Sequence, residues 1–320
     1  MHSPSRTVVM RTKFHQSAIA ASFIVIALTS AGAQAPVERL QQTFRSSVDL
    51  VTIQASVRDS HGRILRGLTP TDFEVRDNGQ LRPIIELRSD QQSPVSFAIL
   101  VDMSGSMRVG PKIAMARQVF QSVLMQLRRG VDEAAVFTFD SAMHERRGFT
   151  TNIDSLASAL ADFEPFGTTS LYDATAATAR RLAERSRTHR AMILLTDGID
   201  TSSHQTAAQV SAVASAIDVP VYVVATVPFV DQRVMLEEAA QLRSSEDADV
   251  RDLAEWTGGH LTFASTLGDA VGAASRIVDE LRQQYVLAIE AAGSREWRRL
   301  DVRVKNSAAT VKTRSGYFGG

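Results

Sequence analysis

The spacing of hydrophobic residues changes along the chain and divides it into three regions. In the first and last regions, apolar side chains alternate with polar ones, which is the period of a strand with one buried face. Between residues 94 and 283, continuous apolar runs of strand length alternate with stretches of helical period. Strands covered by helices on both faces show such continuous runs, so this region predicts a doubly wound, mostly parallel sheet flanked by helices.

The middle region predicts strands and helices in strict alternation, as right-handed crossovers require. The expected strands are residues 95–101, 134–139, 191–195, 219–227 and 260–264. The expected helices are residues 112–128, 171–186, 206–217, 234–256 with an interruption near 244, and 267–284.

The two flanking regions, residues 41–90 and 284–320, are each too small to close a hydrophobic core alone. The first contains Asp77-Asn78-Gly79, a strong hairpin signal. Their expected strands are residues 48–57, 73–76 and 81–87, and the segments around Tyr285, Leu300 and Val311. We therefore expect the two regions to pair into one small all-β, sandwich-like unit beside the α/β domain at 94–283.

The first residues resemble a secretory leader. Three basic residues precede an apolar run from Ala18 to Leu28, and Ala31-Gly32-Ala33 resembles an A-x-A cleavage site. We expect residues 1–33 to be a signal peptide and the mature chain to be periplasmic or secreted. The alternative is an uncleaved, membrane-tethering anchor, because a spanning helix needs only ~17–25 apolar residues. No later segment has the length and apolar character to span a bilayer.

Composition excludes several classes of site. Lys plus Arg number 35 and Asp plus Glu also number 35, with no long run of one sign, so nothing favours nucleic acid as a partner. The absence of cysteine excludes disulfides, zinc–thiolate sites, iron–sulfur clusters and cysteine nucleophiles.

The sharpest chemical feature follows the first strand of the middle region. Asp102, Ser104 and Ser106 place one carboxylate and two hydroxyls at alternate positions, and Gly105 allows the backbone to fold around a small centre. In open α/β sheets, ligands bind beyond the carboxyl ends of the strands. Oxygen ligands in a tight loop suit a hard cation, Mg²⁺ or Mn²⁺, better than zinc.

Two further loops occupy equivalent places in the alternation. Gly167-Thr168-Thr169-Ser170 precedes a predicted helix, and Thr196-Asp197-Gly198 follows a predicted strand. The order D-x-S-x-S, G-x-T, T-D-G resembles the metal-ion-dependent adhesion site of von Willebrand factor type A and integrin inserted domains. The resemblance covers about residues 94–283 and implies these metal ligands: Asp102, Ser104, Ser106, Thr169 and Asp197, the last directly or through water. Thr168 would be the ligand in place of Thr169 if the match to the G-x-T motif shifts by one residue.

The resemblance also implies a function. In that family the metal keeps one open coordination position, which an acidic side chain of the partner fills. The expected protein is a non-enzymatic, adhesion-type module that binds a protein or peptide ligand with an exposed Asp or Glu. The segments Gly67–Val75 and Gln284–Leu287 resemble those that bracket the domain in exported bacterial proteins related to von Willebrand factor A.

Two other functions stay open at this stage. In one, the β unit contacts the partner and the metal only stiffens the loops; in the other, the metal activates water in a hydrolase. Serine-hydrolase, P-loop and dinucleotide motifs are absent, and no general base stands beside the metal loops. Asp140 and Asp200 are interpreted as turn or supporting residues, and Lys112 as part of a solvated helix face.

Overall fold

The computed structural model describes residues 50–89, 93–186, 189–216, 218–227, 249–293, 295–305 and 308–319. The predicted leader at 1–33 and the helical pattern at 234–248 lie outside these ranges. Within them, no helix has the length and hydropathy needed to cross a membrane.

A mixed sheet forms the centre of the α/β domain, and within the described residues it has six strands in the order β10-β9-β8-β5-β6-β7. Their bounds are β5 (Val95–Asp102), β6 (Glu133–Phe139), β7 (Met143–Thr150), β8 (His189–Thr196), β9 (Val221–Ala225) and β10 (Leu261–Phe263). Neighbouring strands are parallel except β7, which runs antiparallel to β6. The predicted mostly parallel sheet is confirmed.

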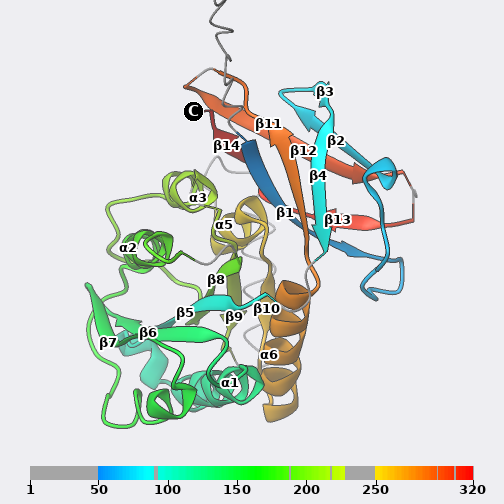
Figure 1. Cartoon of the computed structure of the whole chain (residues 1–320). Helices are drawn as coiled ribbons and strands as arrows, with labels where there is room; N and C mark the ends of the chain where they lie inside the picture. Colours follow the sequence, from blue (N-terminus) through cyan, green and yellow to red (C-terminus); the bar gives the residue numbers. More distant parts are fainter. Residues whose placement is uncertain are drawn as a thin grey trace, which may run out of the picture. The chain divides into compact units, whose positions relative to one another are not determined.

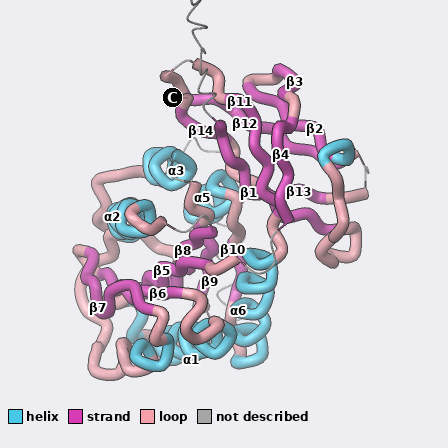
Figure 2. The backbone as a smooth tube through the Cα atoms, in the orientation of Figure 1, coloured by secondary structure: helices cyan, strands magenta, loops and turns pink. Residues whose placement is uncertain are grey.

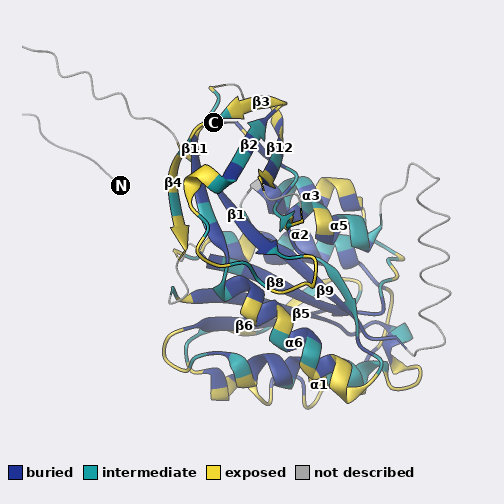
Figure 3. Ribbon diagram, turned by 90° about the vertical axis from the view of Figure 1, so that its right-hand side faces the viewer, coloured by how far each residue is buried: buried dark blue, intermediate teal, exposed yellow. Residues whose placement is uncertain are grey.

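Helices cover both faces of this sheet (Figure 1). On one face lie α1 (Lys112–Gln126) and α6 (Leu267–Arg282); on the other lie α2 (Leu171–Ala183), α3 (Ala207–Ala216) and α5 (Val250–Thr257). Successive residues of β5 serve the two faces: Ile99 belongs to the apolar cluster with α1 and α6, whereas Leu100 belongs to the cluster with α2. All of β5 is buried, which explains its continuous apolar run (Figure 3).

Both terminal regions contribute to each sheet of the β unit (Figure 2). One sheet has the order β13-β1-β11-β4 and the other β14-β12-β2-β3. The bounds are β1 (Leu50–Arg58), β2 (Phe73–Asp77), β3 (Gln80–Arg82), β4 (Ile84–Ser89), β11 (Tyr285–Glu290), β12 (Trp297–Val304), β13 (Thr310–Lys312) and β14 (Gly316–Phe318). A shared apolar cluster fills the space between the sheets and includes Ile53, Val75, Leu287 and Val302. The β unit built from N- and C-terminal segments is therefore part of the fold.

Three details differ from the sequence predictions. The strand expected at 81–87 is two strands, β3 and β4, which join different sheets on either side of Pro83. Proline lacks the N–H that a continuous ladder needs, so the chain changes sheets there. Strands β7 and β14 were not predicted, because β7 is a largely polar edge strand and β14 has only three residues.

Three short 3-10 helices complete the described elements: η1 (Pro70–Asp72), η2 (Gly105–Arg108) and η3 (Ile153–Leu156). The second one begins directly within the D-x-S-x-S loop, at the carboxyl end of β5. The strand order reverses at this point, because β6 and β8 lie on opposite sides of β5. Such a switch point opens a crevice beside the strand ends, which places the loop where ligands bind in this class of sheet.

Candidate metal centre

The first loop is folded tightly around its own polar groups. The Ser104 amide donates to Asp102 Oδ1 at 2.8 Å, and the Ser104 and Ser106 hydroxyl oxygens lie 3.1 Å apart. The Gly105 amide donates to the Gly167 carbonyl at 2.9 Å, which joins the first loop to the second. A Cβ at Gly105 would lie 3.2 Å from that carbonyl oxygen, so glycine permits this close approach.

Asp102 is a fully buried carboxylate whose hydrogen bonds only partly compensate its charge. Thr196 Oγ1 donates to Asp102 Oδ2 at 2.7 Å, in addition to the bond from Ser104. Burial raises the pKa of Asp102 from 3.8 to about 6, and the negative charge of Asp197 adds to the rise while the hydrogen bonds oppose it. The two carboxylates are thus close enough to repel each other, and a cation between them would relieve that repulsion.

Asp197 follows β8 and is also buried, with a fully enclosed side chain. Its Oδ2 accepts a hydrogen bond from Lys112 Nζ at 2.9 Å, whereas its buried Oδ1 has no hydrogen-bond partner. Lys112 begins α1, and its side chain is only 13% exposed. The interpretation of Lys112 as part of a solvated face is therefore wrong: its ammonium group belongs to the site.

The second loop is bonded to the third. The Thr169 amide donates to Thr201 Oγ1 at 2.9 Å, and the Thr169 carbonyl accepts from the amides of Thr201 and Ser202. Thr169 is buried, and no hydrogen bond to its hydroxyl occurs within the described ranges. Thr168 is exposed, and its hydroxyl accepts from Ser202 Oγ at 3.1 Å. These contacts favour Thr169 over Thr168 as the residue with a hydroxyl available to a ligand.

The two other acidic residues near the strand ends hold the loops. Asp200 Oδ1 accepts from the Leu171 amide at 2.8 Å and from Ser203 Oγ at 2.6 Å, so it caps the beginning of α2. Asp140 Oδ1 accepts from Ser141 Oγ and the Ala142 amide, which closes a turn. Both arrangements agree with the turn and supporting roles expected from the sequence.

The donor set fits a hard cation. It combines two buried carboxylates, one with an unpartnered oxygen, and the hydroxyls of Ser104, Ser106 and Thr169. No group of three or more His, Cys, Asp or Glu side chains suited to a metal occurs in the part of the chain described. A cation held between these loops would draw on hydroxyl oxygens besides carboxylates, which are ligands that Mg²⁺ and Mn²⁺ accept. Direct contacts connect Asp102, Ser104 and Ser106. Asp197 follows Thr196, whose hydroxyl donates to Asp102, and Thr169 is connected through the backbone of its loop.

Sequence reasoning missed two members of this cluster, Thr196 and Lys112. Thr196 was quoted only as part of the T-D-G motif, although its hydroxyl donates to Asp102. A signal for Lys112 did exist, since it is the first residue of the helix that follows the D-x-S-x-S loop. Its contact with a residue 85 positions away is a property of the tertiary structure.

Comparisons with known proteins give one family match and several similar solved structures. Residues 97–199 match the family model of the von Willebrand factor type A domain. No curated protein sequence matches the chain. Among solved structures, a von Willebrand factor type A protein from Catenulispora acidiphila is 12% identical with a TM-score of 0.48, over 86% of this chain and 76% of that one.

Two further structures have comparable scores. Proximal thread matrix protein 1 from the mussel byssus, solved with zinc in its MIDAS motif, is 14% identical with a TM-score of 0.47, over 63% of this chain and 50% of that one. The conserved hypothetical protein BatB from Bacteroides thetaiotaomicron is 15% identical with a TM-score of 0.45, over 58% of this chain and 97% of that one. This chain thus spans half the length of the mussel protein.

Proposed function

Because residues 97–199 form a von Willebrand factor type A domain, we propose that this protein binds one Mg²⁺ or Mn²⁺ ion and, through it, an acidic side chain of a partner. The metal ligands in this proposal are Asp102, Ser104, Ser106, Thr169 and Asp197. The partner is a protein or peptide with an exposed Asp or Glu, and the role is adhesion-type binding without catalysis.

The observation that carries this proposal is the buried, uncompensated negative charge at the ends of β5 and β8. Asp197 Oδ1 is enclosed without a hydrogen-bond partner, and burial raises the pKa of Asp102 to about 6. Burying a carboxylate without full compensation is strongly unfavourable, so such groups mark sites that hold a cation or act chemically. A single lysine, Lys112, offsets only part of the charge.

Each residue has a distinct task in the site. The Ser104 amide and the Thr196 hydroxyl fix both oxygens of Asp102, which sets the direction of its carboxylate. The Ser104 and Ser106 hydroxyls lie together beside it, and the Gly105–Gly167 bond holds the loop of Thr169 against the first loop. When bound, the ion would supply a hard Lewis-acidic centre that attracts a carboxylate oxygen of the partner. Pre-organised ligands of this kind lower the entropic cost of binding.

The decisive experiment measures metal binding by isothermal titration calorimetry on Asp102→Ala. We expect wild-type protein to bind Mg²⁺ or Mn²⁺ at one site and the variant to lose this binding, with an unchanged circular dichroism spectrum. Asp162→Ala, which alters an exposed carboxylate in the loop before Gly167, is the matched control and should bind like wild type. Unchanged metal affinity in Asp102→Ala would remove the basis of the proposal.

Partner binding and the absence of catalysis need separate tests. A pull-down from the native host with and without chelator should retain a protein partner only when metal is present. Phosphoester and peptide substrates should show no metal-dependent turnover that Asp102→Ala abolishes. Turnover of that kind would favour the hydrolase alternative, and chelator-resistant binding would favour the β unit as the contact surface.

We also propose export after cleavage behind Ala33, with segments at 41–90 and 284–320 around a domain at 94–283. The basic start, apolar run and A-x-A-like site in the sequence support cleavage. Mass spectrometry of the protein from its host should give an N-terminus at Gln34. An intact leader in the membrane fraction would indicate a tethered protein instead.

A further inference from the structure

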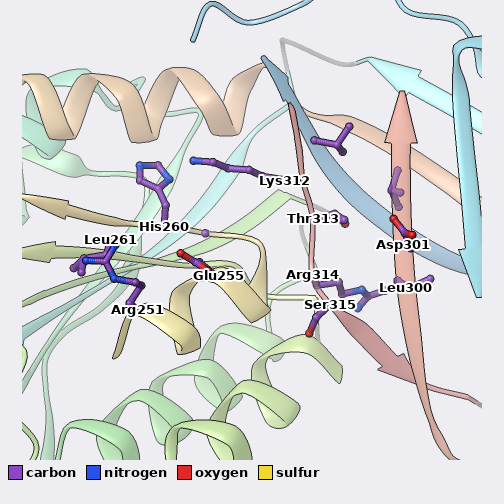
Figure 4. A pocket seen from close by; sticks show the side chains of 13 residues that line it. Arg251, Glu255, His260, Leu261, Leu300, Asp301, Lys312, Thr313, Arg314 and Ser315 are labelled. Carbon is purple, nitrogen blue, oxygen red and sulfur yellow. The ribbon is translucent and has the colours of Figure 1, made fainter. Parts of the chain in front are cut away.

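A cavity of about 430 Å³ lies between α5 with the segment leading into β10 and the strands β12 and β13 of the β unit (Figure 4). It is separate from the proposed metal site. The metal loops follow the carboxyl ends of β5 and β8, whereas Gly259 and His260 precede the amino end of the parallel strand β10. The metal site and the cavity therefore lie at opposite edges of the same sheet.

Two cations that line this cavity have no counter-ion at contact distance. Lys312 on β13 is partly buried, and its ammonium group makes no hydrogen bond or ion pair with any described residue. Arg251 on α5 lines the opposite side, and its guanidinium likewise makes none within the described ranges. Figure 4 shows Lys312 extending from β13 toward His260, with Arg251 and Glu255 contributed by α5. Unpaired, partly buried cations are unfavourable unless an anion joins them.

Three buried polar atoms of the lining are unsatisfied as well. Thr313 Oγ1, His260 Nδ1 and Arg314 Nε are enclosed without a hydrogen-bond partner, although the two terminal nitrogens of Arg314 donate to backbone carbonyls. The nearest acid to His260 is Glu280, 3.8 Å away, and Glu280 Oε2 already accepts two hydrogen bonds from Arg58, at 2.6 and 3.2 Å. Buried polar groups are nearly always satisfied, so several orphans around one cavity indicate a missing partner.

The local charges favour an anion as that partner. Burial lowers the pKa of His260 to about 4, and Lys312, Arg58 and Arg276 lower it further, while Glu280 opposes them. Burial also lowers the pKa of Lys312, the carboxylate of Glu280 raises it, the charge of Arg58 lowers it, and Glu255 raises it. The two carboxylates of the lining offset the cations only in part: Asp301 is bonded to Arg303, and Glu255 is exposed and makes no ion pair with Lys312 or Arg251 at contact distance within the described ranges.

Apolar residues also line the cavity and favour one kind of anion. Leu261 and Val311 are partly buried and keep some exposed surface, whereas Leu300 and Val302 of β12 are almost fully buried in the core between the two sheets. A fully hydrated inorganic ion would leave this surface uncovered, whereas a small organic acid places its carboxylate at the cations and its body against the apolar side chains. Hydrogen bonds that involve charged groups are also the stronger ones.

We propose that this cavity binds a small organic carboxylate, held by Lys312, Arg251 and the Thr313 hydroxyl and packed against Leu261 and Val311. The site is independent of the metal. It assigns a ligand role to the junction between the α/β domain and the β unit, since α5 supplies one side of the cavity and β12 and β13 the other.

The test is calorimetric titration of the whole chain with benzoate, after divalent metal has been removed with a chelating resin so that no soluble chelator, itself a carboxylate, is present. Benzamide is the neutral probe of the same shape, and inorganic phosphate is the second anion. The test variant is Lys312→Met. Its matched control is Lys305→Met, which removes an exposed lysine directly after β12. Thr313→Val removes only the hydroxyl and serves if Lys312→Met fails to fold.

We expect saturable binding of benzoate to wild type and to Lys305→Met. Lys312→Met should bind benzoate about tenfold or more weaker than wild type, and wild type should bind benzamide about tenfold or more weaker than benzoate. Thr313→Val should bind benzoate about three- to tenfold weaker, because it loses only a hydrogen bond from a neutral group. Equal affinity for benzoate and benzamide, or no saturable benzoate binding by wild type, would overturn the proposal. Tighter binding of phosphate than benzoate would refute the organic class of ligand.

Discussion

Replacing Lys112 with Met tests the proposed electrostatics of the metal centre most directly. The substitution keeps the length and packing of the side chain but removes the ammonium group that lies 2.9 Å from Asp197 Oδ2. The Asp197 side chain is fully enclosed and its Oδ1 is already unpartnered, so the variant leaves a buried carboxylate with no compensating cation in metal-free protein.

The expected loss of stability follows from these contacts. Removing one partner of a buried ion pair costs about 3–5 kcal/mol, and the 13% exposure of Lys112 places this case near 3 kcal/mol. With an unfolding entropy of about 2.1 cal/mol/K per residue, that change lowers the midpoint of thermal unfolding of a 320-residue chain by roughly 4–5 °C. Lysine at the first residue of a helix opposes the helix dipole, so its removal returns up to about 1 kcal/mol.

Bound metal should restore the stability that Lys112→Met loses, if the ion binds at the proposed site. Without Lys112, Mg²⁺ no longer competes with a tethered cation for Asp197, so its affinity should rise about tenfold or more. At a concentration of about 100 times the dissociation constant, bound metal adds about 2.7 kcal/mol of stability and restores most of the loss.

The assay is thermal unfolding in chelator and in excess Mg²⁺, paired with calorimetric titration of the ion. Lys305→Met is the control for removing a lysine at an exposed position. A Lys112→Met protein that is as stable as wild type in chelator would refute the claim that the lysine compensates Asp197. If Lys112→Met bound Mg²⁺ with equal or weaker affinity than wild type, the proposed competition between Lys112 and the ion would be refuted. If wild type bound no Mg²⁺, the metal site itself would be refuted.

Two further predictions concern the framework. A Cβ at Gly259 would clash with the Val221 carbonyl oxygen, so Gly259→Ala should lower the free energy of unfolding in urea by about 3 kcal/mol. A Cβ at Gly268 would lie 3.7 Å from its nearest neighbour, so Gly268→Ala should leave that free energy unchanged or raise it by up to about 1 kcal/mol. Equal effects of the two would contradict the close packing at Gly259. Because burial lowers the pKa of His260 from 6.5 to about 4, the unfolded chain binds its proton first; stability should fall as the pH drops from 6.5 to 4, by at most about 3 kcal/mol. His260→Asn should remove that part of the pH dependence. A variant whose stability depends on pH in the same way as wild type would contradict the role of His260.

The fold class could be predicted because burial leaves a periodic record in the sequence. The run at 95–101 is apolar at nearly every position since β5 is covered on both faces, and this pattern distinguishes it from the alternating strands β1 and β12. Pro83 shows the limit of such patterns. It interrupts one apolar stretch, but only the pairing of β3 with β2 and of β4 with β11 reveals that the chain changes sheets there.

Edge strands lay beyond prediction for a related reason. The residues of β7 are mostly polar, and one side of the strand has no neighbouring strand among the described residues, so neither period nor burial marks it. Its pairing with β6 decides its conformation. The shortest strands carry even less local information and depend on their partners in the same way.

For the candidate site, the sequence by itself determined which oxygen-bearing residues follow which strands: Asp102, Ser104 and Ser106 after the first, Asp197 after a later one, and Thr169 before a helix. Those positions depend on local spacing and on the rule that parallel strands end at one edge of a sheet. Only the tertiary structure decided the charges around them. Whether a carboxylate is buried, shares its hydrogen bonds with Thr196 or is paired with Lys112 depends on segments far apart in the chain, because desolvation and Coulomb energies follow distance in space and not separation in sequence.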